Sequence, residues 1–380
     1  MHVAVALLRA DGRLLLLPED DRWTAPSAPV EGSPADAARR AATTLAGDAT
    51  LVRSGEAVDA ADGGDTRRVH PFLFDCVRGD ADGEWVHAPE IRRRETDPWL
   101  WSAYDRVRPT VETISADRDH GASWLSVRAL TALRDEAALA ATPDAVYETA
   151  AALRAARPSM TPLRTRVSRA LAAAEDGDGS LPAAAERAAS TAIDDAVVAD
   201  AEAAATAAKL DADRVVTLSR SGTVRRAIEA LDPEAVLIAA SHPGGEGVAV
   251  AGDLAATTAV TLTSDAGLAA AVDEFDPDAA LVGADTVTAD GALLNKVGTR
   301  GLALSAERAG VPLYAVTATA KVSGRTDPAV ESAGDLDADA PDGVGTYDPL
   351  FDLTPASLVA GYCTEAGIVD PADIGSFAPE

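Results

Sequence analysis

Residues 214–239 read RVVTLSRSGTVRRAIEALDPEAVLIA. A short apolar run opens this stretch, a polar turn and an amphipathic helix follow, and a second apolar run closes it. Short, continuously apolar strands that alternate with helices are typical of a parallel sheet covered on both faces. The stretch therefore predicts a strand, a crossover helix and a second, parallel strand.

The same alternation continues through the C-terminal part of the chain. Strands are predicted at Arg214–Leu218, Ala235–Ala239, Ala259–Thr263, Ala279–Val282 and Leu313–Thr317, and helices at Thr223–Leu231, Ser264–Glu274, Thr299–Ala309 and Pro355–Glu365. We expect residues 211–380 to form a Rossmann-like α/β domain that binds its ligand at the carboxyl ends of the strands. The acidic stretch Asp327–Thr346 is predicted to be a surface loop or crossover.

Two further domains are predicted upstream. Residues 133–210 are expected to form a helical subdomain, because almost the whole stretch has helical patterning. Residues 1–132 are expected to form an α+β domain, and all five tryptophans occur before residue 125. The elements predicted there are the strands Val3–Leu8, Leu14–Leu17 and Val69–Val77, with a turn at Asp11-Gly12, and the helices Pro34–Leu45 and Trp124–Ala138.

Composition narrows the kinds of partner and the compartment. The chain has 61 acidic and 33 basic residues and a formal charge of −28, which disfavours direct binding to nucleic acids or anionic membranes. An acidic, alanine-rich, lysine-poor composition is typical of cytoplasmic proteins from salt-loving archaea, where salt screens the self-repulsion. The cysteines Cys76 and Cys363 lie far apart and form no metal or redox pattern, and no apolar run is long enough to span a membrane. We expect a cytoplasmic protein.

The distribution of lysine points to an anionic ligand. Only three lysines occur, and two of them, Lys296 and Lys321, lie near strand ends beside Gly, Asn and Thr. A compact ammonium in such surroundings is suited to phosphate, although chance placement is the alternative.

Polar clusters follow several of the predicted strands, at 217–223, 241–247, 283–285 and 317–321. The topology gathers these clusters on one rim of the sheet. Ser221, Gly222 and Thr223 lead into a helix whose amides could hold a phosphate, or they form an ordinary strand-to-helix turn. Asp285 is a candidate acid or base at a strand end, with a helix cap or a structural salt bridge as the alternative.

From about residue 140 to 370 the sequence resembles the initiation factor 2B alpha/beta/delta family, which also contains ribose 1,5-bisphosphate isomerase and methylthioribose-1-phosphate isomerase. The resemblance rests on Ala156-Arg-Pro-Ser159, Val216–Thr223, Ser241-His-Pro-Gly-Gly-Glu-Gly247, Gly283-Ala-Asp285, Asn295-Lys-Val-Gly-Thr299, Lys321 and Asp348-Pro-Leu-Phe-Asp-Leu-Thr-Pro355. It implies a helical subdomain, a Rossmann-like subdomain, and a homodimer or larger assembly. Neither a cofactor nor a metal is expected at this site.

The resemblance also implies roles for individual residues. In the isomerase members a cysteine after the first strand and the aspartate of the Gly-Ala-Asp motif act as an acid/base pair. Asp285 matches the aspartate, whereas Ser219 occupies the cysteine position and has no adjacent histidine to activate it. His242 and Ala240 stand where relatives often have arginine and glutamate. The phosphate-binding residues implied by the resemblance, Arg157, Asn295, Lys296 and Lys321, are all present, so binding is expected to survive better than catalysis. His242 is a further candidate for substrate binding, in place of the arginine of relatives.

The first domain resembles a Nudix domain, through the hairpin, Trp23-Thr-Ala-Pro26 and the segment Val30–Arg40. A Nudix hydrolase holds magnesium with glutamates on one helix face, but these positions are Ala41, Thr44 and Leu45. We therefore expect a sensor or interaction module without hydrolase activity. The Arg92–Arg94 run is interpreted as a solvated face, with a functional patch as the alternative.

Three functions remain open on the sequence. The first is a regulatory or binding protein that recognises a phosphorylated ribose or a nucleotide. The second is a sugar-phosphate aldose–ketose isomerase of the ribose 1,5-bisphosphate isomerase type, in which Asp285 works with another group or with water. The third is a module that binds a protein partner such as a translation factor.

Overall fold

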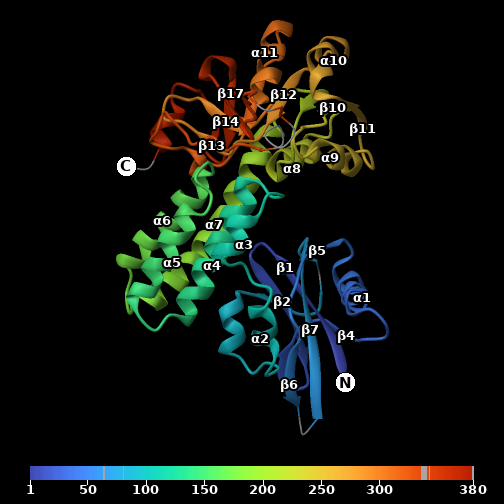
Figure 1. The fold of residues 1–380 in the computed structure, drawn as a ribbon, viewed down its shortest axis with the longest axis vertical. Helices are drawn as coiled ribbons and strands as arrows, with labels where there is room; N and C mark the ends of the chain where they lie inside the picture. Colours follow the sequence, from blue (N-terminus) through green and yellow to red (C-terminus); the bar gives the residue numbers. More distant parts are fainter. Residues whose placement is uncertain (63–64, 80, 335–339, 342, 379–380) are drawn as a thin grey trace. The chain divides into compact units, whose positions relative to one another are not determined.

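The C-terminal part of the computed structural model is built on a seven-stranded sheet with the order β11-β10-β9-β12-β15-β17-β18 (Figure 1). Its strands are β9 (Arg214–Thr217), β10 (Ala235–Ala239), β11 (Ala259–Thr263), β12 (Ala279–Val282), β15 (Leu313–Val316), β17 (Gly361–Thr364) and β18 (Gly367–Val369). Neighbouring strands are parallel except β17 and β18. The predicted parallel sheet is therefore confirmed, and its five predicted strands all form.

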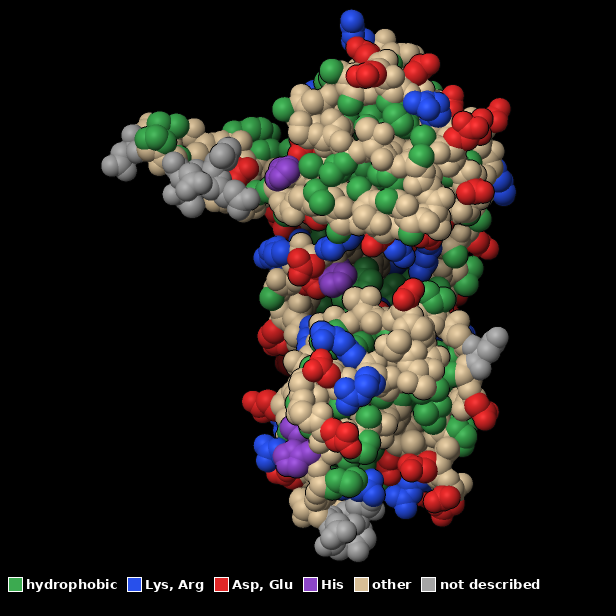
Figure 2. Space-filling view, turned by 90° about the vertical axis from the view of Figure 1, so that its right-hand side faces the viewer, with side chains coloured by type: hydrophobic (Ala, Val, Ile, Leu, Met, Phe, Trp, Pro, Cys, Tyr) green, Lys and Arg blue, Asp and Glu red, His purple; other side chains and the backbone are tan. Residues whose placement is uncertain are grey.

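The structure describes residues 1–62, 65–79, 81–334, 340–341 and 343–378, and contacts divide the chain into two compact units. One unit contains Met1–Ile114, Arg128–Ala150 and Ala170–Asp194, and the other contains Ser115–Val127, Ala151–Arg169 and Asp195–Glu380. Figure 2 shows acidic side chains scattered over the surface with basic ones among them. No helix among the described residues is both long and apolar enough to cross a membrane.

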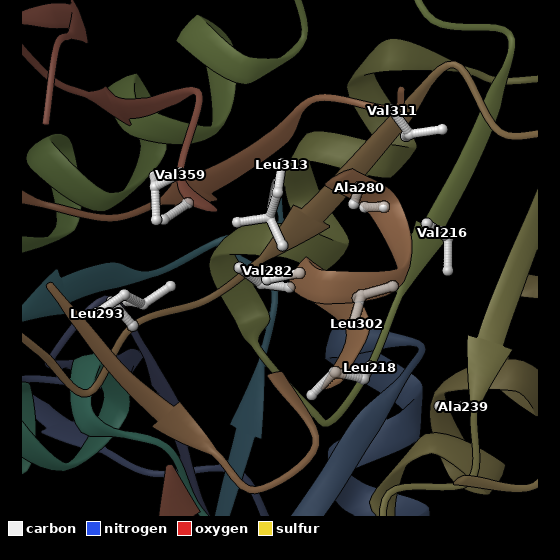
Figure 3. Packing of buried hydrophobic residues seen from close by; sticks show 14 of the residues in the cluster. Val216, Leu218, Ala239, Ala280, Val282, Leu293, Leu302, Val311, Leu313 and Val359 are labelled. Carbon is white, nitrogen blue, oxygen red and sulfur yellow. The ribbon is translucent and has the colours of Figure 1, made fainter. Parts of the chain in front are cut away.

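Two apolar layers hold the seven-stranded sheet. Helices α10 (Leu268–Phe275) and α11 (Thr299–Ala309) pack with Val216 and Val282 on one face. Helices α8 (Gly222–Leu231) and α9 (Glu246–Leu254) pack with Val215 and Leu281 on the other face. Consecutive residues of a strand point to opposite faces of the sheet. A strand that is covered by helices on both faces therefore needs apolar residues at consecutive positions. Figure 3 shows the first layer, where Leu218, Val282 and Leu293 lie close to the strand ends.

The predicted helix Pro355–Glu365 is wrong. Phe351–Thr354 forms β16, Ala356–Leu358 forms the short helix η4, and Gly361–Thr364 forms β17. Tyr362 and Cys363 are fully buried on opposite faces, and β17 pairs with β15. A short apolar run does not distinguish a buried strand from a buried helix, and here the open edge of the sheet decides.

Smaller elements surround the sheet. The chain adds a three-stranded sheet of β13 (Thr286–Val287), β14 (Leu293–Lys296) and β16, and this sheet carries Asn295 and Lys296. The short helices are η2 (Asp265–Gly267), η3 (Thr319–Lys321) and η5 (Ile374–Phe377). In the predicted loop Asp327–Thr346 the described residues form no helix or named strand, and 335–339 and 342 lie outside the described residues.

The N-terminal part of the chain is built on a mixed eight-stranded sheet. Its strands are β1 (His2–Ala10), β2 (Arg13–Glu19), β3 (Arg22–Thr24), β4 (Ser27–Pro29), β5 (Ala49–Ser54), β6 (Val58–Asp62), β7 (Asp65–Cys76) and β8 (Glu84–Val86). The predicted hairpin is confirmed, since Ala10 pairs with Arg13 across Asp11 and Gly12, which have φ of 51° and 74°. Positive φ at both turn residues matches the twist of a two-residue hairpin.

Helices cover both faces of this first sheet. Helix α1 (Pro34–Ala46) packs with Ala4 and Phe72 on one face. Helix α2 (Leu100–Asp105) and the short helix η1 (Ala88–Arg92) pack with Val5 on the other. The result is a layered helix–sheet–helix arrangement; the mixture of helices and strands was predicted, but the helices on both faces were not. The resemblance to a Nudix domain stays a prediction.

The middle of the chain is helical, as predicted. Its helices are α3 (Val111–Ala116), α4 (Ala122–Leu139), α5 (Pro143–Ala155), α6 (Thr161–Glu175) and α7 (Leu181–Ala207). Helices α4, α5, α6 and α7 each contribute residues to both contact units. The boundaries predicted near residues 132 and 210 therefore stay predictions, because contacts change unit part-way along these helices.

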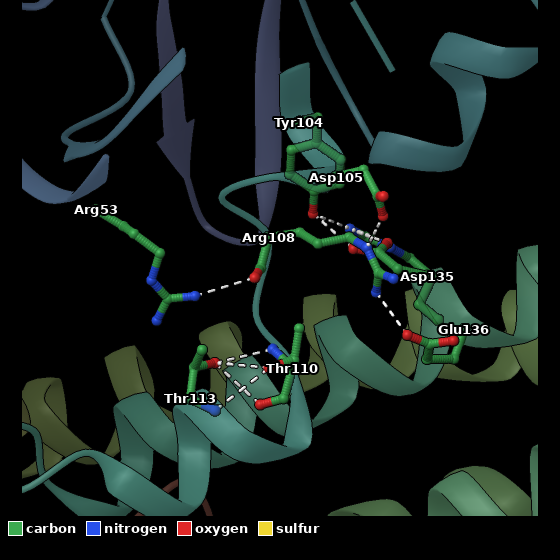
Figure 4. Close-up of polar contacts among 9 residues, drawn as sticks. Arg53, Tyr104, Asp105, Arg108, Thr110, Thr113, Asp135 and Glu136 are labelled. Atoms are coloured by element: carbon green, nitrogen blue, oxygen red, sulfur yellow. Dashed lines mark hydrogen bonds and ion pairs between the residues drawn. The ribbon is translucent and has the colours of Figure 1, made fainter. Parts of the chain in front are cut away.

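Buried polar contacts join the first sheet and its helix α2 to the C-terminal half of α4. Tyr104 Oη donates to Asp135 at 2.6 Å, and Arg134 Nε donates to the same carboxylate at 2.8 Å. Arg108 pairs with Asp105 and with Glu136 (Figure 4). Buried charges need such partners, so these contacts fix α4 against this part of the unit.

The Arg92–Arg94 run has structural contacts. Arg92 donates to the carbonyl of Ala138 at 2.8 Å, Arg93 pairs with Glu186, and Arg94 pairs with Glu90 at 2.7 Å. Arg92 and Arg93 are exposed and Arg94 is partly exposed, as the predicted solvated face requires, and all three guanidinium groups have partners within one compact unit.

Candidate functional site

The candidate site lies where the strand order of the C-terminal sheet reverses. From β9 the chain proceeds through β10 to β11, and it then returns to place β12 on the other side of β9. Connections on either side of such a point leave a crevice at the carboxyl ends of the two strands. The segments that emerge there are Ser219–Thr223 after β9 and Gly283–Asp285 after β12.

These two segments touch. A Cβ atom added at Gly283 would come within 2.9 Å of the Ser221 hydroxyl oxygen and 3.7 Å of Asn295 Oδ1. Glycine is therefore needed for the close approach, and three predicted site segments meet at this point.

Asp285 is the most perturbed acid of the site. Burial raises the pKa of its carboxyl to about 6, although Lys321, the backbone amide of Ala122 and Arg157 each lower it. The amide contact means that Asp285 also caps the start of α4, which was the structural alternative left open by the sequence. A cap alone would lower the pKa of the carboxyl, so desolvation is the larger effect here.

Lys321 lies directly beside this acid. Its Nζ donates to the carbonyl oxygen of Ala284 at 2.6 Å, and its side chain is buried. Burial lowers the pKa of Lys321, while Asp200 and Asp285 oppose that shift. The Lys321 ammonium is thus bound to the backbone of Ala284, the residue before Asp285. From there it can stabilise either the Asp285 carboxylate or an anion next to that carboxylate.

Arg157 approaches the same acid from the loop between α5 and α6. It is 3% exposed, its Nη1 donates to the carbonyl of Asp117, and its Nη2 lies 3.3 Å from Glu331 Oε2. Its Nε is buried without a hydrogen-bond partner among the described residues. Ser159 Oγ donates to the other oxygen of Glu331. A carboxylate therefore sits on the guanidinium that was predicted to bind substrate.

Lys296 is also paired with a carboxylate. Its Nζ lies 2.9 Å from Glu246 Oε1, and the lysine is buried. The neighbouring Asn295 donates from Nδ2 to Thr299 Oγ1 at 3.0 Å. The three cations that were predicted to bind substrate, Arg157, Lys296 and Lys321, are therefore charge-matched, because each has an acid nearby.

The residues after β9 and β10 form two linked turns. Ser219 has φ of 64°, and its backbone amide donates to Ser241 Oγ at 2.7 Å. Ser221 caps α8 by accepting from the amide of Val224, as in an ordinary strand-to-helix turn. His242 is exposed and pairs with Asp265 at 2.9 Å. Of the other two predicted residues of this turn, Gly222 is exposed and Thr223 is buried.

Sequence reasoning missed Ser159, Glu246 and Glu331. The first two lie inside motifs that had been noted, so their polar side chains were a usable signal. Glu331 lies in the acidic loop, 174 positions from Arg157, and nothing local marked it. Among the described residues no group of three or more His, Cys, Asp or Glu side chains is placed to hold a metal ion.

Residues 118–371 match the initiation factor 2 subunit family. The chain belongs to this family. A 5-deoxyribose 1-phosphate isomerase from Moorella thermoacetica is 38% identical over 98 residues, which are 23% of this chain and 28% of that protein. The matched part thus spans less than a third of that relative's length.

Two solved structures have the same fold as the matched part of this chain. The translation initiation factor eIF-2B of Pyrococcus horikoshii OT3 superimposes with a TM-score of 0.60 and 27% identity, covering 69% of this chain and 95% of that one. The 5-methylthioribose 1-phosphate isomerase of the same organism gives a TM-score of 0.59 and 21% identity, covering 78% and 88%. The family resemblance inferred from the motifs is confirmed.

Proposed function

We propose that this family member is an aldose–ketose isomerase that acts on a ribose phosphorylated at C1. The observation that carries the proposal is Asp285, a buried carboxyl with a pKa raised to about 6 at the strand-order reversal. The similarity to the 5-deoxyribose 1-phosphate isomerase of Moorella thermoacetica supports this isomerase interpretation over the regulatory one. A carboxyl with a pKa near neutrality can both donate and accept a proton.

The reaction makes two demands on the site. The bond between C1 and the ring oxygen breaks, and the ring oxygen takes up a proton. The hydrogen on C2 moves to C1, and the C2 hydroxyl loses its proton as it becomes the carbonyl. In the proposal, protonated Asp285 gives its proton to the ring oxygen and then takes up the proton of the C2 hydroxyl. Lys321 stabilises the ionised carboxylate between the two transfers.

Ser219 stands where the isomerase members have a thiol, and its hydroxyl is a poor acid. If the C2 hydrogen passes directly to C1 within the sugar, no second protein base is required. The proposal therefore depends on Asp285 and does not depend on Ser219.

Formation of the ketose from ribose 1-phosphate, followed by ¹³C NMR, tests the proposal. We expect turnover by the full chain and a loss of at least about 100-fold in Asp285→Asn, the usual scale for removing a general acid/base. Asp352→Asn is the matched control, because that partly buried acid also has a pKa raised to about 6 but caps α11 through the amides of Gly298 and Arg300. Absence of turnover in the full chain would remove the proposal.

The second candidate function is a binding or regulatory protein for the same class of ligand. Ser219 favours it, because the thiol of the active relatives is missing. Binding of ribose 1-phosphate without turnover, and turnover gained in Ser219→Cys, are the results that would select this candidate.

The remaining expectations belong with this proposal. The expected homodimer or larger assembly is tested by light scattering at several salt concentrations. A Nudix-like sensor role for residues 1–132 is tested by nucleotide binding to the full chain. Recovery of a bound translation factor at native salt would support the partner-binding alternative.

A further inference from the structure

In the ion pair of Lys296 with Glu246, only one of the two carboxylate oxygens has a hydrogen-bond partner among the described residues. Glu246 Oε1 lies 2.9 Å from Lys296 Nζ, and the side chains are 20% and 6% exposed. The second oxygen, Oε2, is buried without a hydrogen-bond partner among the described residues. A buried carboxylate oxygen with no donor is costly, so its position indicates that a donor belongs beside it.

The position of Glu246 is fixed by the backbone around it. It is the first residue of α9, after Gly244 and Gly245 with φ of 98° and 69°. A Cβ at Gly244 would come within 2.9 Å of the Glu246 carboxyl carbon, and a Cβ at Gly247 within 1.9 Å of the Ala239 carbonyl. Glycine at both positions lets the turn close around the carboxylate and lets α9 start against the end of β10.

Charge decides what this end of the site can accept. The ammonium of Lys296 is already matched by Glu246, so a dianionic phosphate there would meet a net repulsion from the carboxylate in a poorly hydrated environment. A sugar hydroxyl has the opposite properties, because it can donate to Glu246 Oε2 and accept from Lys296 Nζ.

At a second predicted cation, the guanidinium of Arg157, the buried Nε has no hydrogen-bond partner among the described residues. The carboxylate opposite, that of Glu331, belongs to a segment outside the helices and named strands. A phosphate could displace this carboxylate without moving a helix, whereas Glu246 is held in place.

We propose that Glu246 makes the Lys296 end of the site a position that binds a hydroxyl and rejects phosphate. The ligand is then a ribose with a single phosphate group, and a ribose bisphosphate is excluded. This inference rests on the proposed function, since it names the substrate class of the same site.

Calorimetric titration of the full chain with ribose 1-phosphate and ribose 1,5-bisphosphate tests it. We expect the wild-type chain to bind the monophosphate at least about tenfold more tightly. In Glu246→Gln the side-chain amide oxygen still accepts from Lys296, but the negative charge is removed. We expect the ratio of the affinities for the two sugars to fall below about threefold in this variant. Glu229→Gln is the matched control, with the same charge change on an exposed side chain of α8 that pairs with Arg225.

Each outcome has a distinct meaning. Equal or tighter binding of the bisphosphate by the wild-type chain overturns the inference, and so does an unchanged preference in folded Glu246→Gln. If Glu246→Gln fails to fold by circular dichroism, the wild-type preference alone decides. Failure of both sugars to bind removes the proposed function together with the inference, whereas the expected preference without turnover removes only the isomerase.

Discussion

At the scale of single residues, Asp285 combines a structural and a chemical role. It accepts from the first amide of α4, and its carboxyl is buried beside Lys321. The cap favours the ionised form, whereas burial favours the protonated form, and burial has the larger effect on the pKa. A group balanced in this way titrates close to neutrality, which suits proton transfer better than capping.

The stability of the chain should report this balance. The pKa of Asp285 is about 6 in the folded chain and near 3.9 when unfolded, so the folded chain binds more protons between those values. The free energy of unfolding therefore falls as pH rises from about 4 to about 6. We expect this fall to be smaller by about 2 kcal/mol in Asp285→Asn, measured by urea denaturation at fixed ionic strength.

Asp352, whose pKa is also about 6, titrates in both proteins and cancels in that comparison. Identical pH dependence of the wild-type chain and Asp285→Asn would contradict the raised pKa of Asp285.

At the scale of elements, the start of α9 positions the carboxylate of Glu246. The helix begins one residue before Gly247, which lies against the last residues of β10. The hydrogen bond from the Gly247 amide to the Ala240 carbonyl, 3.1 Å long, holds this approach. The absence of a side chain at Gly247 is thus what allows the turn and the helix to meet.

Two glycines of the same helix give a matched test. Gly247→Ala places a methyl group 1.9 Å from the Ala239 carbonyl, and we expect it to lower the free energy of unfolding by roughly 1–3 kcal/mol. Gly252→Ala meets nothing within 4 Å and should be neutral or stabilise by up to about 1 kcal/mol. Urea denaturation measures both, and equal effects of the two substitutions would argue against the close approach.

At the scale of the whole molecule, contacts group the first sheet with one end of the central helices. Arg134 Nη1 donates to the carbonyl of Gly12 at 2.9 Å, and Arg13 pairs with Asp194 at 2.6 Å. Both contacts lie within one compact unit. The helical region is continuous in sequence, but its helices are divided between the two contact units. The ends that lie in the first unit pack with the first sheet, which therefore completes the packing of those ends.

A truncated chain that starts at Ser115 tests this grouping. It retains Arg134 and Asp135 but loses their partners Gly12 and Tyr104, so buried charges become unpaired. We expect aggregation or a thermal midpoint at least about 5 °C below that of the full chain, measured by calorimetry. An unchanged midpoint would favour a separable first domain, as the boundary predicted near residue 132 implies.

Features of the fold that depend on residues near one another in the sequence were predictable, whereas features that depend on residues far apart were not. The five predicted strands of the C-terminal sheet were found because each is a short, largely apolar run. The inner strands β9, β10, β12 and β15 are mostly buried, whereas the edge strand β11 is largely exposed. The strand Ala279–Val282 also placed Asp285 at a strand end, although helix α9, between the second and third strands, was not predicted. The strand β17 was missed, because only the free edge of β15 distinguishes it from a helix.

The sequence alone determined the parallel sheet, the family of the chain and the strand ends that carry polar residues. These three features depend on residues only a few positions apart. Only the tertiary structure decided how the charges are matched. It brought Glu246 to Lys296 and Glu331 to Arg157, and it buried Asp285 deeply enough to raise its pKa. Burial and electrostatic pairing depend on residues far apart in the chain, so no local pattern could have shown them.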